Sequence, residues 1–178
     1  MNWIFESERL GFRRLNEGDL AHVKVFLQDI EVMYAWGHIF TDEEAAEWIQ
    51  KNIKRYTEDG YSYFAAIEKH SGAFSGVIGP LKEEIEGVSY TEIAYILNKS
   101  CWGKGYAVEG AQAAVDYAFR ELGCDAIIAQ IKPDNLTSIK VAQRLGMIET
   151  GSFIKHYRGE DLLHLILTVT KEQWAKER

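Results

Sequence analysis

Trp102-Gly103-Lys104-Gly105-Tyr106-Ala107 is the stretch that decides the fold of this 178-residue chain. It lies between a predicted strand and the start of a predicted helix. The two glycines and the small residue let the backbone approach an anion closely. The helix start adds unpaired N–H groups and the positive end of the helix dipole, and Lys104 adds a cation. Together these groups predict a binding site for a pyrophosphate.

Other readings of a glycine pair are a tight strand-to-helix turn without a ligand, a P-loop or a dinucleotide fingerprint. No Gly-Lys-Ser/Thr follows, which excludes a P-loop, and the third glycine of the dinucleotide fingerprint is missing. A second signal follows the next strand, where Pro133 breaks the strand and Asn135 is placed to cap a short helix. A helix cap alone explains Asn135 but not the combined pattern.

The remaining chain predicts one unbroken series of elements, and therefore one domain, residues 1–178. A capping box begins one helix, since Glu44 comes three residues after Thr41. The strand–helix–strand unit from Tyr90 to Ile131 predicts a parallel crossover in a mixed α/β sheet. The expected strands are Glu8 to Leu15, Tyr61 to Glu68, Phe74 to Leu81, Tyr90 to Leu97, Ala126 to Ile131, Ile148 to Ile154 and Leu162 to Thr170, and the expected helices are Asn16 to Gln28, Thr41 to Asp59, Tyr106 to Leu122 and Asn135 to Leu145.

Composition excludes several classes of function. The net charge of −7 argues against broad nucleic-acid binding, which needs a basic footprint, and it mildly favours a cationic substrate. Cys101 and Cys124 fit no zinc or redox motif, and no His/Cys/carboxylate cluster has the spacing of metal ligands. No apolar run approaches the length of a membrane span, and the first six residues lack the basic and apolar segments of a signal peptide. We therefore expect a cytoplasmic protein without a metal.

Three motifs in order carry a resemblance to a known family. They are the glycine loop with Glu109, the pair Asn135 and Ser138, and Gln143-Arg144-Leu145-Gly146-Met147. With these motifs the chain resembles the GNAT superfamily of N-acetyltransferases, and more closely the branch that acetylates the N-termini of ribosomal proteins. The resemblance covers roughly the whole chain and is specific mainly over residues 90–150. It implies a mostly antiparallel sheet of about seven strands, splayed in its middle, about four flanking helices, and acetyl-CoA as the donor.

The resemblance also implies where CoA binds. In the family the pantetheine arm pairs with the backbone of a splayed strand, which here implicates Ile96 and Leu97. The pyrophosphate would rest on the loop Trp102 to Ala107. Asn135 would contact the pantetheine arm, and the hydroxyl of Ser138 would lie near the thiol sulphur.

The chain departs from the family pattern at three positions. Trp102 stands where the loop often begins with Gln or Arg. Ala142 stands where many members carry a tyrosine general acid, so Ser138 is the better candidate to serve the leaving thiolate. Gln130 stands where some members carry a glutamate base. Lys140 and Arg144 lie on the same short helix as Ser138 and reach either the phosphates or only solvent.

The acceptor amine must lose a proton before it attacks, because it is protonated at neutral pH. Glu92 is the candidate base for a direct attack in a ternary complex. It lies among apolar residues of a predicted strand, where burial raises the pKa of a carboxyl group. The alternative is an edge glutamate that points to water. Positioning, with a backbone N–H of the splayed strand on the thioester carbonyl, would supply the rest of the rate.

The acceptor site is predicted from the aromatic loop of residues 33–40, because the matching region lines the acceptor pocket in the family. The alternative is a loop that only packs onto the core. Trp36 and His38 come from this loop, Tyr157 is expected on the opposite wall, and His164 is expected to be a satisfied core histidine. A protein N-terminus and a small amine both remain open as acceptors, and a homodimer is admitted. Two alternatives to an enzyme also remain, a non-catalytic CoA-binding or regulatory domain and a plain nucleotide-binding domain.

Overall fold

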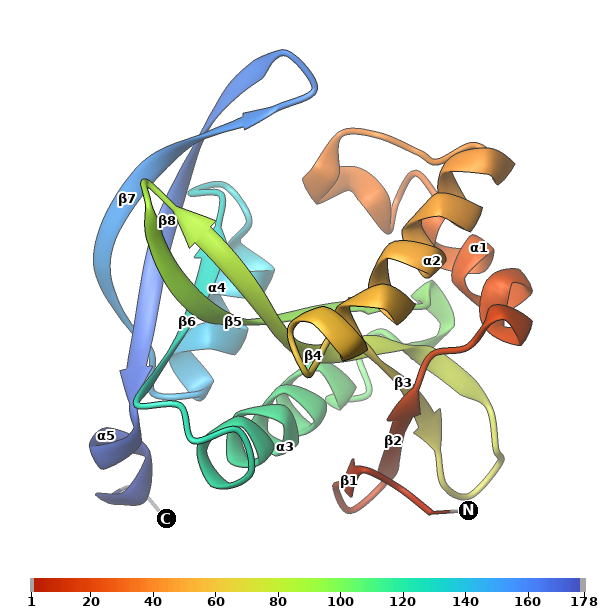
Figure 1. The fold of residues 1–178 in the computed structure, drawn as a ribbon, viewed down its shortest axis with the longest axis horizontal. Coiled ribbons are helices and arrows are strands. Elements are labelled where there is room, and N and C mark those ends of the chain that lie inside the picture. The colour runs from red at the N-terminus through yellow and green to blue at the C-terminus, as the bar shows by residue number, and fades with distance from the viewer. Residues whose placement is uncertain (1, 177–178) are drawn as a thin grey trace.

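An eight-stranded sheet runs through the computed structural model, which describes residues 2–176, in the order β1-β2-β3-β4-β5-β6-β8-β7 (Figure 1). No helix in this range is long and apolar enough to cross a membrane. The strands are β1 (Phe5–Glu6), β2 (Leu10–Arg14), β3 (Phe64–Glu68), β4 (Phe74–Ile85), β5 (Val88–Leu97), β6 (Ala126–Ile131), β7 (Ile148–Tyr157) and β8 (Glu160–Thr170). The α-helices are α1 (Leu20–Leu27), α2 (Asp42–Glu58), α3 (Tyr106–Arg120), α4 (Leu136–Arg144) and α5 (Lys171–Lys176), and 3₁₀ turns η1, η2 and η3 cover Glu17–Asp19, Met33–Trp36 and Lys99–Cys101.

The predicted fold class is confirmed, with two additions at the ends. β5 and β6 are parallel, as the crossover predicted, and the other neighbouring strands are antiparallel. The sequence pattern missed β1, which has two residues, and α5, which has six. Neither is long enough to show a period of its own. The pattern also placed the end of β4 too early, because β4 and β5 continue as a long hairpin beyond Leu81.

The helices pack on both faces of the sheet. Figure 1 shows α1 and α2 on one side of β2 to β5 and α3 on the other. α2 begins with the predicted capping box, in which Thr41 and Glu44 exchange side-chain and backbone hydrogen bonds. α3 lies very close to β2 and β4, because a Cβ at Gly110 would fall 2.3 Å from the Cδ1 of Ile78. This close packing holds the N-terminal half of α3 against the middle of the sheet.

Candidate functional site

The sheet opens between β5 and β6. These two parallel strands share a single register pair, Glu92 with Ile128, and β5 then runs on to Leu97. On its other edge, β5 stays paired with β4 up to Leu97. This opening is the splay that the resemblance implied. Glu92 lies at its closed end, and the following residues of β5 have one edge free.

The register decides which backbone groups of β5 face the opening. The N–H of Asn98 donates to the carbonyl of Ser75 at 2.9 Å, so this opposed pair is hydrogen-bonded. Such pairs alternate along an antiparallel ladder. The backbone groups of Ile96 therefore point to β4, and those of Tyr95 and Leu97 point into the opening. The register supports the expected contact at Leu97 and moves the other one from Ile96 to Tyr95.

The glycine loop lies at the open end of the splay. Gly103 and Gly105 have φ of 72° and 80°, the left-handed region that suits glycine. α3 begins at Tyr106, and its N-cap residue Gly105 provides no side-chain cap, so the first amides of the helix lack a capping side chain. The indole of Trp102 donates from Nε1 to the carbonyl of Leu97 at 3.2 Å. That bond ties the loop to the end of β5.

A second cation stands beside Lys104 at the loop, and the sequence pattern did not reveal it. The guanidinium of Arg9 forms an ion pair of 2.6 Å with Glu109, in the first turn of α3. It also lies 4.6 Å from the ring centroid of Tyr106, and a Cβ on Gly105 would come within 3.4 Å of its Nη2. Arg9 lies about a hundred positions earlier in the chain, on the turn between β1 and β2, so only the fold brings it to the loop.

α4 supplies the two polar residues that the sequence singled out. Asn135 is the N-cap, and its Oδ1 accepts a hydrogen bond from the backbone N–H of Ser138 at 3.2 Å. The hydroxyl of Tyr95 donates to Oγ of Ser138, also at 3.2 Å. Burial raises the pKa of Tyr95, so the phenol keeps its proton at neutral pH. Ala142 is buried and brings no acid, yet Tyr95, which the sequence analysis missed, places a phenol in this region.

The two basic residues of α4 lie outside the main cavity. Lys140 is exposed to solvent. Arg144 is also exposed, and it borders an open groove that Gly105 and Glu109 line as well. Arg144 thus lies on the same groove as the glycine loop, whereas Lys140 remains a prediction without a structural contact.

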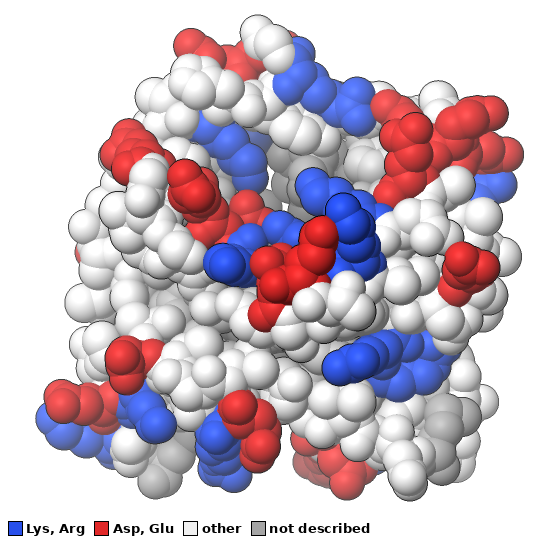
Figure 2. Space-filling model, in the orientation of Figure 1, with Lys and Arg blue, Asp and Glu red and all other residues white. Residues whose placement is uncertain are grey.

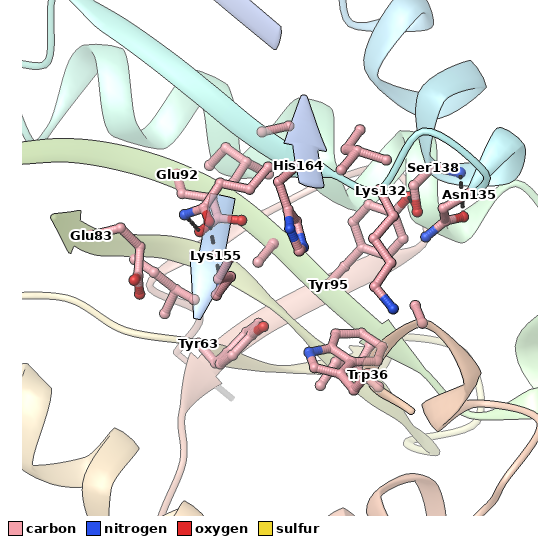
Figure 3. A pocket seen from close by; sticks show the side chains of 18 of the residues that line it. Trp36, Tyr63, Glu83, Glu92, Tyr95, Lys132, Asn135, Ser138, Lys155 and His164 are labelled. Carbon is pink, nitrogen blue, oxygen red and sulfur yellow. Dashed lines mark hydrogen bonds between the residues drawn. The ribbon is translucent and has the colours of Figure 1, made fainter. Parts of the chain in front are cut away.

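A cavity of about 610 Å³ joins the splay to the space between α2, η2 and the β7–β8 hairpin. Side chains from the helical side and from the sheet point into it, with Trp36 and Tyr63 facing His164 and Lys132 (Figure 3). Charged groups of both signs surround the hollow on this face (Figure 2). An ion pair of 3.0 Å between Arg158 of the β7–β8 turn and Glu44 of α2 spans the cavity from one wall to the other.

Glu92 lines this cavity, so it is not an edge residue that points away from the site. Burial, helped by the nearby carboxylate of Glu83, raises its pKa to about 8, against the opposing effects of Lys155, Gln130 and Arg55. Its Oε2 accepts a hydrogen bond of 2.9 Å from Nε2 of Gln130. Gln130, which stands where some family members carry a glutamate base, therefore holds the carboxyl group of Glu92 in place. Glu92 has the raised pKa that the sequence analysis expected.

Only some of the residues predicted for the acceptor side line the cavity. Trp36 and Tyr157 both line the cavity, and their role toward an acceptor stays a prediction. His38 is not among the lining residues, because its Nε2 bonds to Glu44 at 2.9 Å and the ring is held beside α2. His164 lines the cavity, so its interpretation as a core histidine was wrong. Side chains alternate along β8, so His164 and Leu162 lie on the same face of the strand. The sequence shows this alternation, but only the structure shows that this face borders the cavity.

Known proteins are similar to this chain in sequence. The sequence profile of the acetyltransferase (GNAT) domain family matches residues 9–148. The chain belongs to this family. Two Bacillus subtilis relatives are similar to this GNAT protein, the uncharacterized protein YkkB and the uncharacterized N-acetyltransferase YnaD. YkkB is 32% identical over 79% of this chain and 83% of its own length. YnaD is 32% identical over 84% of this chain and 85% of its own length.

Solved GNAT structures have the same fold. An acetyltransferase from Bacillus anthracis is 28% identical, with a TM-score of 0.80 over 95% of this chain and 99% of that one. RimJ of Mycobacterium smegmatis, in complex with CoA-disulfide, gives a TM-score of 0.77 at 20% identity over 95% and 88%. A spermidine N-acetyltransferase of Vibrio cholerae, in complex with CoA and spermine, gives 0.75 at 19% identity over 94% and 98%. The last two likenesses, at 20% and 19% identity, concern the fold, and the ribosomal-protein branch stays a prediction.

Family and fold together make this GNAT protein an acyltransferase of the N-acetyltransferase type. Similar folds are known with CoA or a CoA derivative bound. Within residues 2–176, no group of three or more His, Cys, Asp or Glu side chains has a metal-binding arrangement.

Proposed function

We propose that this protein transfers the acetyl group of acetyl-CoA to a primary amine by direct attack in a ternary complex, in the cytoplasm. The observation that carries the proposal is the position of Glu92. This half-buried carboxyl group lies at the closed end of the splay and lines the same cavity as Ser138 and Asn135. The cavity thus offers a proton acceptor for the amine at one end and hydroxyl groups for the leaving thiolate at the other (Figure 3).

The donor side rests on backbone groups and a few cations. The N–H groups of the glycine loop and the first turn of α3 would bind the pyrophosphate, with Arg9 and Lys104 as neighbouring cations. The free edge of β5 at Tyr95 and Leu97 would pair with the pantetheine arm. A backbone N–H on that edge would also stabilise the negative charge that develops on the thioester oxygen.

The acceptor side rests on Glu92 and on the aromatic wall. Trp36, Tyr63 and Tyr157 would exclude water around the amine. Glu92 would take the amine proton directly or through one water. On the thiolate side, Ser138 would donate its hydroxyl proton to the sulphur and take a proton from Tyr95, whose O–H donates to the Oγ of Ser138. Tyr95 would then regain a proton from water, and Glu92 would release to water the proton that it took from the amine.

The test is a turnover screen with acetyl-CoA against small amines and N-terminal peptides, combined with thermal melting. Acetyl-CoA and CoA should raise the Tm, whereas ATP and NAD should not, because a ligand stabilises the state that binds it. CoA stabilisation without turnover of any amine would favour the alternative of a non-catalytic CoA-binding domain. Stabilisation by ATP or NAD alone would contradict the proposed donor.

The glycine loop gives a direct test of the donor site. We expect Gly105→Val to weaken CoA binding at least about 10-fold, because the side chain would stand between the backbone N–H groups and the pyrophosphate. Isothermal titration calorimetry measures the change.

The matched control for that variant is Gly123→Val. Gly123 also has a positive φ, 68°, and no atom lies within 4 Å of an added Cβ. Gly123 follows the C-terminal end of α3, whereas the glycine loop precedes its N-terminal end. Valine at position 123 should therefore cause a similar backbone strain and leave the CoA affinity unchanged. Equal CoA affinities in folded Gly105→Val and wild-type protein would remove the loop from the site.

A further inference from the structure

Two lysines in the cavity wall form no ion pair within residues 2–176, although Lys155 is near enough to Glu92 to lower the pKa of that carboxyl group. Lys132 directly follows β6, Lys155 lies in β7, and both are half-buried. Within residues 2–176, no ion pair joins either ammonium group to a carboxylate. The Nζ of Lys155 has only a long contact of 3.4 Å, to Oε1 of Gln130. A partly buried charge without a counter-charge is costly, so a ligand anion would relieve both residues.

His164 lies between these two lysines and adds no negative charge. Burial is the main cause that lowers its pKa, and both Lys155 and Lys132 lower it further, which places both charges near the ring. Its Nδ1 lies 3.1 Å from the carbonyl oxygen of Leu162, so Nδ1 carries the hydrogen and donates it. Because its pKa is lowered from the ordinary value of 6.5, the ring is neutral near pH 7. In Figure 3 it hangs into the cavity between Lys155 and Lys132.

Four carboxylates line the cavity: Glu47 is exposed to solvent, and the other three are engaged or uncharged. Glu44 bonds to Arg158 on one oxygen and to His38 on the other, and Glu83 bonds to Arg55 at 3.0 Å. Glu92 has a pKa of about 8, so it is mostly uncharged at neutral pH. The wall thus offers no free pair of carboxylates to a polycation. The local charges reverse the expectation of a cationic acceptor that the net charge of the chain suggested.

We propose that Lys132 and Lys155 hold a carboxylate of the acceptor, so that the acceptor is a small molecule with both an amino and a carboxylate group. This inference rests on the proposed acetyl transfer and names its substrate class. The carboxylate would bind the two ammonium groups beside His164. The amino group would then turn toward Glu92, in the part of the cavity that Trp36 and Tyr63 wall off.

Steady-state kinetics with matched acceptors test the substrate class. L-phenylalanine and β-alanine are each compared with their carboxamides, which keep the amine and nearly the same size, and spermidine is included as a polycation. Because a carboxamide also changes the basicity of the amine, the informative quantity is how the carboxylate-to-carboxamide ratio of kcat/KM changes between variants. We expect Lys132→Gln and Lys155→Gln each to lower this ratio about 10-fold or more.

Lys54→Gln is the control variant. Lys54 is an exposed lysine of α2 that pairs with Glu58, and neither residue lines the cavity. This variant should leave the ratio unchanged. The inference is overturned if spermidine is the best wild-type acceptor. It is also overturned if Lys132→Gln and Lys155→Gln lower kcat/KM equally for carboxylates and carboxamides.

A binding measurement separates this inference from the proposed catalysis. 3-Phenylpropionate carries a carboxylate and no amine, so calorimetry on the CoA-bound protein reports the carboxylate site without turnover. We expect it to bind the wild type and to bind Lys132→Gln at least about 10-fold more weakly. Binding without turnover of any amine would keep the carboxylate site and contradict the proposed function. If Lys132→Gln weakens CoA itself as much as it weakens 3-phenylpropionate, the lysine belongs to the CoA site and the inference fails.

Discussion

Glu92→Gln should lower kcat about 100-fold or more while CoA binding stays unchanged, because the variant keeps the shape of the side chain and removes the proton acceptor. The amide oxygen of the variant can still accept the hydrogen bond that Nε2 of Gln130 now donates to Glu92. A general base works only in its deprotonated form, so wild-type kcat should rise with pH through the pKa of Glu92, about 8. The pH–rate profile of the variant should lack this acidic limb.

The competing account is that the amine loses its proton to water before it binds. The limb would then follow the pKa of the acceptor and persist in Glu92→Gln. Two acceptors of different basicity separate the accounts. Glu83→Gln sharpens the test, since Glu83 helps to raise the pKa of Glu92 and its loss should move the limb to lower pH. Glu92 is not the base if the acidic limb of the pH–rate profile stays at the same pH in Glu83→Gln and moves with the pKa of the acceptor.

The same pKa has a consequence for stability that does not depend on activity. The pKa of Glu92 is raised in the folded state from its ordinary value of 4.5 to about 8, so the folded state favours the protonated carboxyl group. The wild type should therefore lose stability relative to Glu92→Gln as pH rises from about 4.5 to about 8, and no further above that range. Thermal melting of both proteins across this range measures the difference. A constant difference in Tm would show that the pKa of Glu92 is not raised.

Ser138→Ala should lower kcat about 10- to 1,000-fold, by analogy with the loss of a single donor that acts on transition-state charge. The hydroxyl would serve the sulphur only as negative charge develops, so CoA affinity should fall much less than kcat. Single-turnover kinetics report the chemical step without product release. A normal rate for that step in Ser138→Ala would remove the residue from the mechanism.

Tyr95→Phe tests whether the two hydroxyl groups act as one unit. The phenol donates to Oγ of Ser138 at 3.2 Å, so its removal should reproduce much of the loss seen in Ser138→Ala. The double variant should then be little slower than the slower single variant, because groups that act in series are not additive. Losses that multiply in the double variant would mean that Tyr95 and Ser138 act independently.

The sequence by itself determined the features that depend on local chemistry. The glycine loop, the cap at Asn135 and the strand–helix–strand unit from Tyr90 to Ile131 each follow from backbone requirements within a few residues. These requirements predicted the α/β class and the parallel crossover, and they indicated a donor site that stays a prediction. The raised pKa of Glu92 could also be predicted from the sequence, because its neighbours in the strand are apolar.

Only the tertiary structure decided which distant groups meet. Tyr95 reaches Ser138 across 43 positions, and Arg9 reaches Glu109 across 100. Strand parity sets which face a side chain takes but not what lies opposite, so His164 could be assigned to a wall only once the cavity was located. His38 bonds to the capping carboxylate of Glu44 and is not among the residues that line the cavity. Contacts of this kind depend on how the chain packs over long separations, and the local pattern of residues carries no distance between segments that are far apart in sequence.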